Sequence, residues 1–174
     1  ENFEELKSYC YRVASVVGLI CIEIFGYEDK TAREHATNMG IAMQLTNILR
    51  DIREDAEIDR IYIPLDEMAQ FGYSEKDLKA SVFNKPFREL MAFQVARARD
   101  YYQRSEKLFP LLESESRACP KVLHAAYLAI LNRIEAANYA VFSHRIGLSF
   151  MGKSLIVGRL WTASFLTRLS ILRH

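Results

Sequence analysis

Hydrophobic residues recur at helical spacing along nearly the whole chain. In the first segment, residues 2–25, apolar positions fall three or four apart, and Gly26 then ends the pattern. They are Tyr9, Val13, Val16, Val17, Ile20 and Ile24. We find no sustained alternation of apolar and polar residues with the period of two that is typical of a half-buried strand. The pattern predicts a long first helix and an all-α protein.

Proline and glycine separate further helical segments. The expected helices are 29–55, 74–80, 85–113, 120–145 and 153–172, and the connection 56–72 contains a short helical turn over 65–70. Ser74 and Asp77 have the spacing of a capping box. Pro110 lies near the end of its segment, where it is expected to kink or stop the helix. We predict one all-α domain over residues 1–174, with about five long helices.

Composition narrows the class of protein. The chain has 174 residues, of which 50% are hydrophobic and 26% are charged, a balance that excludes a disordered segment. Lys and Arg number 23 against 22 Asp and Glu, so the net charge of +1 argues against nucleic acid as a partner. Three cysteines without C-x-x-C spacing argue against a zinc site or a disulfide framework. Reduced thiols in a cytosolic interior are expected.

The chain ends carry few targeting signals. The sequence has no charged-then-apolar leader, so we expect no signal peptide. Because the first residue is Glu1 and not Met, we also expect that a preceding part is missing. No uncharged apolar run reaches about 18 residues, so no ordinary membrane span is expected. Trp161 and Phe165 lie among basic residues in the last segment, as in interfacial helices, although a core-packing helix is the favoured alternative. The expected location is cytoplasmic, with peripheral contact at the inner membrane surface as a hypothesis.

A polar stripe follows one side of the predicted helix 29–55. A helix turns ~100° per residue, so with Asn47 at zero, Asp51 falls near ~40° and Asp55 near ~80°. Gln44 and Gly40 share this arc. The neighbouring arc is wholly apolar: Ile41, Leu45, Ile48, Leu49 and Ile52. A carboxamide and carboxylate stripe beside a core stripe, with no Lys or Arg mixed into it, predicts the wall of an internal cavity.

Oxygen ligands one helical turn apart suit a hard cation. Mg²⁺ commonly takes one or two carboxylates and completes its shell with water and the phosphate oxygens of a substrate. Asn47, Asp51 and Asp55 therefore fit Mg²⁺-mediated diphosphate binding. The alternative is an acidic helix end on the surface, which the helix dipole disfavours.

Two stretches resemble signatures of the squalene/phytoene synthase family. Residues 44–55, Gln-Leu-Thr-Asn-Ile-Leu-Arg-Asp-Ile-Arg-Glu-Asp, together with 60–64, resemble its second aspartate-rich motif, and residues 9–18 resemble its other signature. The remainder, including 24–27, resembles the bacterial presqualene diphosphate synthase branch. The resemblance covers nearly the whole chain, but the family's first aspartate-rich motif has no counterpart. It implies the C-terminal portion of an isoprenoid synthase-type helical bundle around a central apolar cavity.

The resemblance also implies an activity. The expected enzyme is a prenyl transferase that condenses two farnesyl diphosphates head to head to presqualene diphosphate, in squalene or hopanoid synthesis. Phytoene synthesis from two geranylgeranyl diphosphates is the nearest alternative, and a noncatalytic prenyl-diphosphate-binding bundle is a further one. The implied cofactor is Mg²⁺, with Mn²⁺ as a substitute, and NADPH only if the reaction continues to squalene. The chain alone is expected to be an incomplete fragment, and its oligomeric state is left open.

Site residues follow from the same match. The catalytic set is Tyr9, Asp51 and Asp55; the substrate-binding set is Gln44, Asn47, Arg50, Tyr127 and Arg145; the metal set is Asn47, Asp51 and Asp55. Tyr9 is implied to face the reacting prenyl groups. The family usually has paired arginines where this chain has His144 and Arg145, so either of the two is a candidate phosphate contact.

Overall fold

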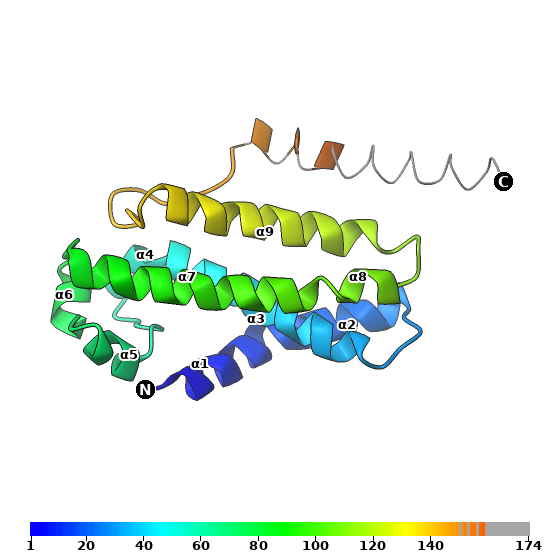
Figure 1. Ribbon diagram of the computed structural model, residues 1–174, viewed down its shortest axis with the longest axis horizontal. Helices are drawn as coiled ribbons and strands as arrows, with labels where there is room; N and C mark the ends of the chain where they lie inside the picture. Colours follow the sequence, from blue (N-terminus) through cyan, green and yellow to red (C-terminus); the bar gives the residue numbers. More distant parts are fainter. Residues whose placement is uncertain (150, 153, 156, 159–174) are drawn as a thin grey trace.

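The protein is an all-α bundle, shown as a computed structural model in Figure 1. The structure describes residues 1–149, 151–152, 154–155 and 157–158. Within these ranges the one β-type contact is an isolated antiparallel bridge between Tyr27 and Leu112. The elements are α1 (Phe3–Cys10), the π-helix η1 (Tyr11–Ser15), α2 (Val16–Phe25), α3 (Ala32–Arg50), α4 (Ile52–Glu57), α5 (Leu65–Gln70), α6 (Glu75–Lys79), α7 (Lys85–Ser105), α8 (Leu108–Leu111) and α9 (Ala118–Ala136). The predicted all-α class is confirmed.

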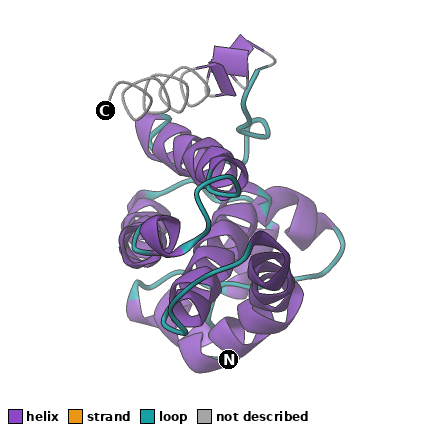
Figure 2. Cartoon of the chain, turned by 90° about the vertical axis from the view of Figure 1, so that its right-hand side faces the viewer, coloured by secondary structure: helices purple, strands orange, loops and turns teal. Residues whose placement is uncertain are grey.

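Helix α3 is the centre of the bundle. It packs against α7, α9, η1 and α2, and Figure 2 shows the long helices nearly end-on around one another. The whole apolar arc predicted for helix 29–55, which lies on α3 and the start of α4, is buried: Ile41, Leu45, Ile48, Leu49 and Ile52. A buried hydrogen bond of 2.8 Å joins the hydroxyls of Thr46 and Tyr102 and ties α3 to α7. The core therefore positions the polar stripe that lies next to the apolar arc.

The first helical segment crosses α3 at close range. Ser15 is fully buried, and its Oγ donates a hydrogen bond of 2.8 Å to the Thr37 carbonyl. A Cβ added at Gly40 would lie 2.6 Å from the Ser15 Cα, so only glycine fits at this crossing. A π-helical turn, η1, lies at the crossing itself; such turns often lie at functional sites.

The apolar periodicity of this segment does not mark its buried side. Leu6, Cys10 and Ile22 are buried, whereas most of the residues that carry the periodic pattern are exposed. By length and composition, Phe3–Phe25 could cross a membrane, with a mean hydropathy of 1.5 and 17% of its most apolar window buried. Arg12 and Glu23 bound the longest uncharged run of this segment, so it does not contradict our expectation that no uncharged apolar run reaches about 18 residues. Core helices of soluble proteins meet the same criterion.

Two predicted helices end earlier than expected. Helix α7 ends at Ser105 rather than 113, because the ring of Pro110 clashes with the carbonyl four residues earlier and breaks the helix in the preceding turn. Helix α9 ends at Ala136 rather than 145, because Asn138 and Tyr139 adopt positive φ angles of 50° and 64° and turn the chain back. The predicted helix over 153–172 lies largely outside the described residues.

The connection after α4 matches its prediction closely. The short helix α5 spans Leu65–Gln70. Helix α6 begins with the predicted capping box, in which the Asp77 backbone N–H donates to Ser74 Oγ and the Ser74 N–H donates to Asp77 Oδ2, both at 3.1 Å. These short elements hold the chain that returns from the polar motif.

Candidate functional site

The polar motif spans the junction of α3 and α4. Asp51 interrupts the helix with φ −103° and ψ 15°. The backbone bonds still run through the junction, since Asp51 N–H donates to the Asn47 carbonyl at 2.9 Å and Asp55 N–H to the Asp51 carbonyl at 2.8 Å. The three residues therefore keep the spacing of one turn that the sequence predicts, despite the break.

Asn47 has an oxygen without a partner. Its Nδ2 donates a hydrogen bond of 3.3 Å to Gln44 Oε1, and its Oδ1 is buried with no hydrogen-bond partner among the described residues. An unpaired buried acceptor costs about 1–3 kcal/mol. An amide oxygen held in this way is the type of atom that a hard cation binds.

Asp51 is held between its sequence neighbour Arg50 and the distant Arg145. Arg50 Nε donates to its Oδ1 at 2.7 Å, and Arg145 Nε and Nη2 donate to Oδ1 and Oδ2 at 2.8 and 3.2 Å. Burial by itself would raise the pKa of Asp51, but the two guanidinium groups hold that pKa below its ordinary value. The left-handed turn after α9 brings Arg145 to this position, and His144 instead hydrogen-bonds Ser143 at 2.9 Å.

Asp55 lies in the opposite electrostatic environment. Burial, and then the negative charge of Asp51, raise the pKa of Asp55 above its ordinary value. Glu54 Oε2 is also buried and, within the described ranges, has no hydrogen-bond partner. The sequence argument missed Glu54, although the same ~100° per residue places it near −20°, beside Asn47. At the end of the motif, burial and the charge of Asp51 thus outweigh the nearby positive charges of Arg60 and Arg50.

These oxygens fit a cation that also binds water and substrate. Among the described residues, no group of three or more His, Cys, Asp or Glu side chains is arranged to hold a metal. The candidate set contains two carboxylates and one amide, which suits Mg²⁺ sharing its shell with phosphate oxygens and does not suit a closed protein cage. Asn47, Asp51 and Asp55 are the residues that would hold it.

An apolar cavity of about 330 Å³ adjoins the motif. It lies among η1, α2, α3 and α9, and three predicted substrate-binding residues line it together: Gln44, Asn47 and Tyr127. Most of the remaining lining is aliphatic or aromatic. Arg50, Asp51 and Asp55 do not line it. Asn47 therefore belongs both to the polar motif and to the cavity wall.

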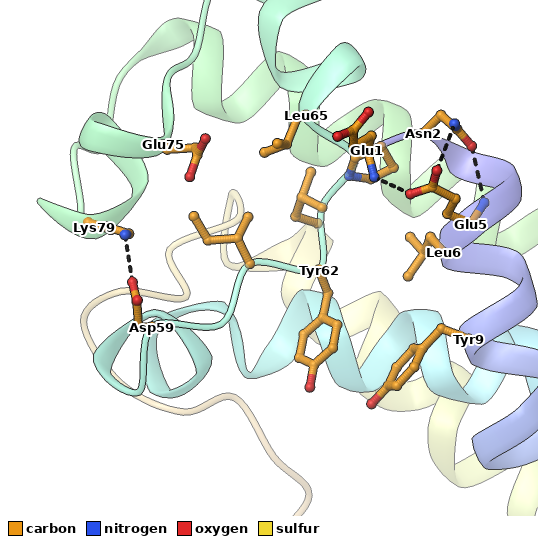
Figure 3. A pocket seen from close by; sticks show the side chains of 13 residues that line it. Glu1, Asn2, Glu5, Leu6, Tyr9, Asp59, Tyr62, Leu65, Glu75 and Lys79 are labelled. Carbon is orange, nitrogen blue, oxygen red and sulfur yellow. Dashed lines mark hydrogen bonds and ion pairs between the residues drawn. The ribbon is translucent and has the colours of Figure 1, made fainter.

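Tyr9 lies at a different hollow, shown in Figure 3. This hollow, of about 450 Å³, is lined by residues of α1, the connection 59–65 and α6. The rings of Tyr9 and Tyr62 stack with centroids 5.0 Å apart. The hydroxyl of Tyr62, followed by burial, raises the pKa of Tyr9 to about 12, and the charge of Asp55 contributes. The charge of Asp55 therefore affects the pKa of Tyr9, although Tyr9 does not line the apolar cavity.

Together these features define a class of protein: a helical bundle in which an amide and carboxylate motif on the central helix meets an apolar cavity. The family model for squalene/phytoene synthase matches residues 1–151. The chain belongs to the squalene/phytoene synthase family, whose members are prenyltransferases of isoprenoid biosynthesis.

Relatives of known name cover most of the chain. It is 43% identical over 156 residues to the 15-cis-phytoene synthase of Synechococcus elongatus, covering 83% of this chain and 51% of that protein. It is 42% identical over 154 residues to phytoene synthase 2, chloroplastic, of Solanum lycopersicum, covering 85% and 50%. The chain therefore spans about half the length of these relatives. Their names support the alternative of phytoene synthesis better than the expected presqualene diphosphate synthesis.

Solved structures confirm the fold. A crystal structure of a dehydrosqualene synthase in complex with ligand matches with a TM-score of 0.85 at 29% identity, covering 97% of this chain and 59% of that one. The squalene synthase HpnC from Alicyclobacillus acidocaldarius matches with a TM-score of 0.77 at 28% identity, covering 80% and 53%. The isoprenoid synthase-type bundle is thus shown.

Proposed function

We propose that this chain carries the second diphosphate-binding motif and much of the prenyl cavity of a Mg²⁺-dependent phytoene synthase. The reaction would be the head-to-head condensation of two geranylgeranyl diphosphates. One observation carries the proposal: Asn47 offers an unpaired buried oxygen at the motif and also lines the apolar cavity. A substrate with an anionic head and a long apolar tail needs both environments at one point.

The proposal assigns a different role to the cation-binding residues, the arginines and the residues of the apolar cavity. When bound, Mg²⁺ would neutralise the charge that develops on the leaving diphosphate. Asn47, Asp51 and Asp55 would hold the cation, and Arg50 and Arg145 would offer planar, bidentate donors to phosphate oxygens. The apolar cavity wall would exclude water from a reactive carbocation. Tyr127, in that wall, and Tyr9, at the neighbouring hollow, offer aromatic faces that stabilise a cation.

The choice of substrate rests on the relatives. Four relatives that are 38–43% identical to this chain are named phytoene synthases. The names dehydrosqualene synthase and squalene synthase come from structures at 28–29% identity. We therefore propose geranylgeranyl diphosphate as the substrate, with farnesyl diphosphate as the alternative. Mn²⁺ would substitute for Mg²⁺, and NADPH would be needed only for squalene formation. The cytoplasmic location remains a prediction.

A chimeric synthase tests this proposal. In it, the matched part of the Synechococcus elongatus enzyme is replaced by the aligned 83% of this chain. The chimera is incubated with geranylgeranyl or farnesyl diphosphate, with and without Mg²⁺ and NADPH, and products are identified by mass spectrometry. We expect phytoene from geranylgeranyl diphosphate, dependent on Mg²⁺ and independent of NADPH.

Other outcomes would contradict specific parts of the proposal. Presqualene diphosphate from farnesyl diphosphate, with no phytoene, would overturn the substrate. A folded chimera that binds Mg²⁺ and inorganic diphosphate by calorimetry without forming product would favour the noncatalytic binding bundle.

A further inference from the structure

Asp51 accepts hydrogen bonds from two arginines at both of its oxygens. Arg50 donates from Nε to Oδ1 at 2.7 Å and from Nη2 to Oδ2 at 2.5 Å. Arg145 donates from Nε to Oδ1 at 2.8 Å and from Nη2 to Oδ2 at 3.2 Å. A carboxylate has about four lone-pair sites, so these four bonds use all of them. A cation can therefore bind Asp51 only after one guanidinium group gives up its bonds.

Arg145 is the partner that can leave. The side chain of Arg50 is 14% exposed, whereas that of Arg145 is 59% exposed. The backbone on both sides of Arg145 is held in place. Arg53 donates a hydrogen bond of 3.0 Å to the Phe142 carbonyl, and Ile146 is buried. The Arg145 side chain can thus turn while its loop stays where it is.

Glu54 offers a second acceptor beside Asp51. It follows Asp51 by three residues, and side chains at this spacing lie about 5–6 Å apart on one side of a helix. Its Oε2 is buried and has no hydrogen-bond partner in the part of the chain that the structure describes. Leaving a buried acceptor unpaired costs free energy, and the cost is larger for a charged group. A guanidinium group that moved from Asp51 to Glu54 would remove this cost.

Both carboxylates already act on Arg145. Hydrogen bonding and charge from Asp51 raise the pKa of Arg145 above its ordinary value, and the charge of Glu54 adds to the rise. Glu54 thus attracts the guanidinium group while that group is still bonded to Asp51. The alternative is that Glu54 binds a cation directly. The two roles predict different effects of Glu54 once Arg145 has been removed.

We propose that Arg145 is a resident counter-cation of Asp51, and that Glu54 is a positioning residue that receives its guanidinium group when Asp51 binds a divalent cation. The motif then exchanges one ion pair for another and keeps Arg145 beside it, available to a phosphate oxygen. This inference rests on the proposed function, because it needs the cation site at Asn47, Asp51 and Asp55. It does not depend on which prenyl diphosphate is the substrate.

Competition for Asp51 is measured in this chain with Mn²⁺ as the probe and without substrate. The signal of free Mn²⁺ in electron paramagnetic resonance gives the dissociation constant. We expect Arg145→Ala and Arg145→Gln each to tighten Mn²⁺ binding at least about threefold, because Asp51 is no longer occupied in part of the molecules. Arg60→Ala is the matched control. Arg60 acts on Asp55 through its charge, and the printed bonds of Asp51 come from other residues. It should change the affinity less than about 1.5-fold at physiological ionic strength.

Glu54→Gln tests the receiving carboxylate. With Arg145 present, it should weaken Mn²⁺ binding about threefold, because the displaced guanidinium group loses its acceptor. In the Arg145→Ala background it should change the affinity less than about 1.5-fold, so the double-mutant cycle shows a coupling between the two residues. Equal weakening in both backgrounds would make Glu54 a direct ligand of the cation and overturn the proposed exchange.

Other results would also overturn the inference. These are unchanged Mn²⁺ affinity in both Arg145 variants, equal tightening by Arg60→Ala, or no Mn²⁺ binding to any variant. The proposed function is tested separately by the products of the chimeric synthase. Phytoene formation by the chimera, with unchanged Mn²⁺ affinity in the Arg145 variants, would overturn only this inference. The expected changes in Mn²⁺ affinity, with no phytoene from the chimera, would overturn only the proposed function.

Discussion

The hollow at Tyr9 and the apolar cavity at Asn47 differ in chemistry more than in size. The larger one, at Tyr9, has a polar rim on which Lys79 pairs with Asp59 at 2.6 Å. The smaller one is mostly apolar and is lined by Asn47, whose buried Oδ1 has no hydrogen-bond partner within the part of the chain that the structure describes. Volume alone would select the larger hollow. Unsatisfied oxygens beside an apolar wall select the smaller one as the candidate active site.

The largest effect on activity is expected from a substitution at the motif, compared with one at the larger hollow. In the chimeric synthase, Asp51→Ala should lower kcat/KM at least about 100-fold, because under the proposed function the loss of this carboxylate weakens Mg²⁺ and diphosphate binding together. Glu5→Ala, at the larger hollow, should change it less than about twofold. Steady-state kinetics with geranylgeranyl diphosphate gives both values. Near-normal turnover of Asp51→Ala would remove the motif from the mechanism.

A second comparison concerns the crossing that shapes the smaller cavity. Gly40→Ala should lower the free energy of unfolding by about 1–3 kcal/mol, because its Cβ would meet the Ser15 backbone. Gly18→Ala is the control on the same interface, since its Cβ would make only a 3.4 Å contact with the Ala36 carbonyl. It should be neutral or slightly stabilising. Urea unfolding of this chain measures both, and equal effects would show that the crossing is not tight.

The two carboxylates of the motif should respond to neutralisation with opposite sign. The pKa of Asp51 is lowered in the folded state, so its charge stabilises the fold above its ordinary pKa of 3.8, and this gain is lost as pH falls through the folded pKa. The pKa of Asp55 is raised, so its charge costs stability above the folded pKa, and this cost disappears below 3.8.

At pH 7, Asp51→Asn should therefore destabilise the chain and Asp55→Asn should stabilise it, each by about 1 kcal/mol or less, because both groups are partly exposed. Both differences should vanish in strong acid. Thermal unfolding as a function of pH measures them. Shifts of the same sign would contradict the contrast between the arginine-paired and the uncompensated carboxylate.

The smallest effect is expected at Tyr9. Tyr9→Phe keeps the ring stacked on Tyr62 and removes only the hydroxyl, so turnover of the chimeric synthase should fall less than about threefold if the ring, rather than the hydroxyl, stabilises a cation. Tyr9→Leu should cost more. Equal losses in the two variants would assign the effect to the hydroxyl and link the larger hollow to the reaction.

Patterns that depend on neighbouring residues were predictable. The capping box of α6, the short helix α5 and the apolar arc of α3 follow from spacing along a few turns, and the structure confirms each. The resemblance of residues 44–55 indicated the family for the same reason, because a motif on one helix keeps its spacing wherever the helix packs. Glu54 could have been found by the same arithmetic.

By itself, the sequence determined the helical class, the family and the one-turn spacing of Asn47, Asp51 and Asp55, since these depend on interactions within a few residues. Only the tertiary structure decided that Arg145 returns to Asp51 and that the periodic apolar side of the first helix faces outward. Both depend on contacts between distant segments: a left-handed turn after α9 redirects the chain, and the Ser15–Gly40 crossing sets which side of the helix is buried. Hydrophobic periodicity within one segment does not predict such contacts, because the spacing is the same whichever side of the helix another segment covers.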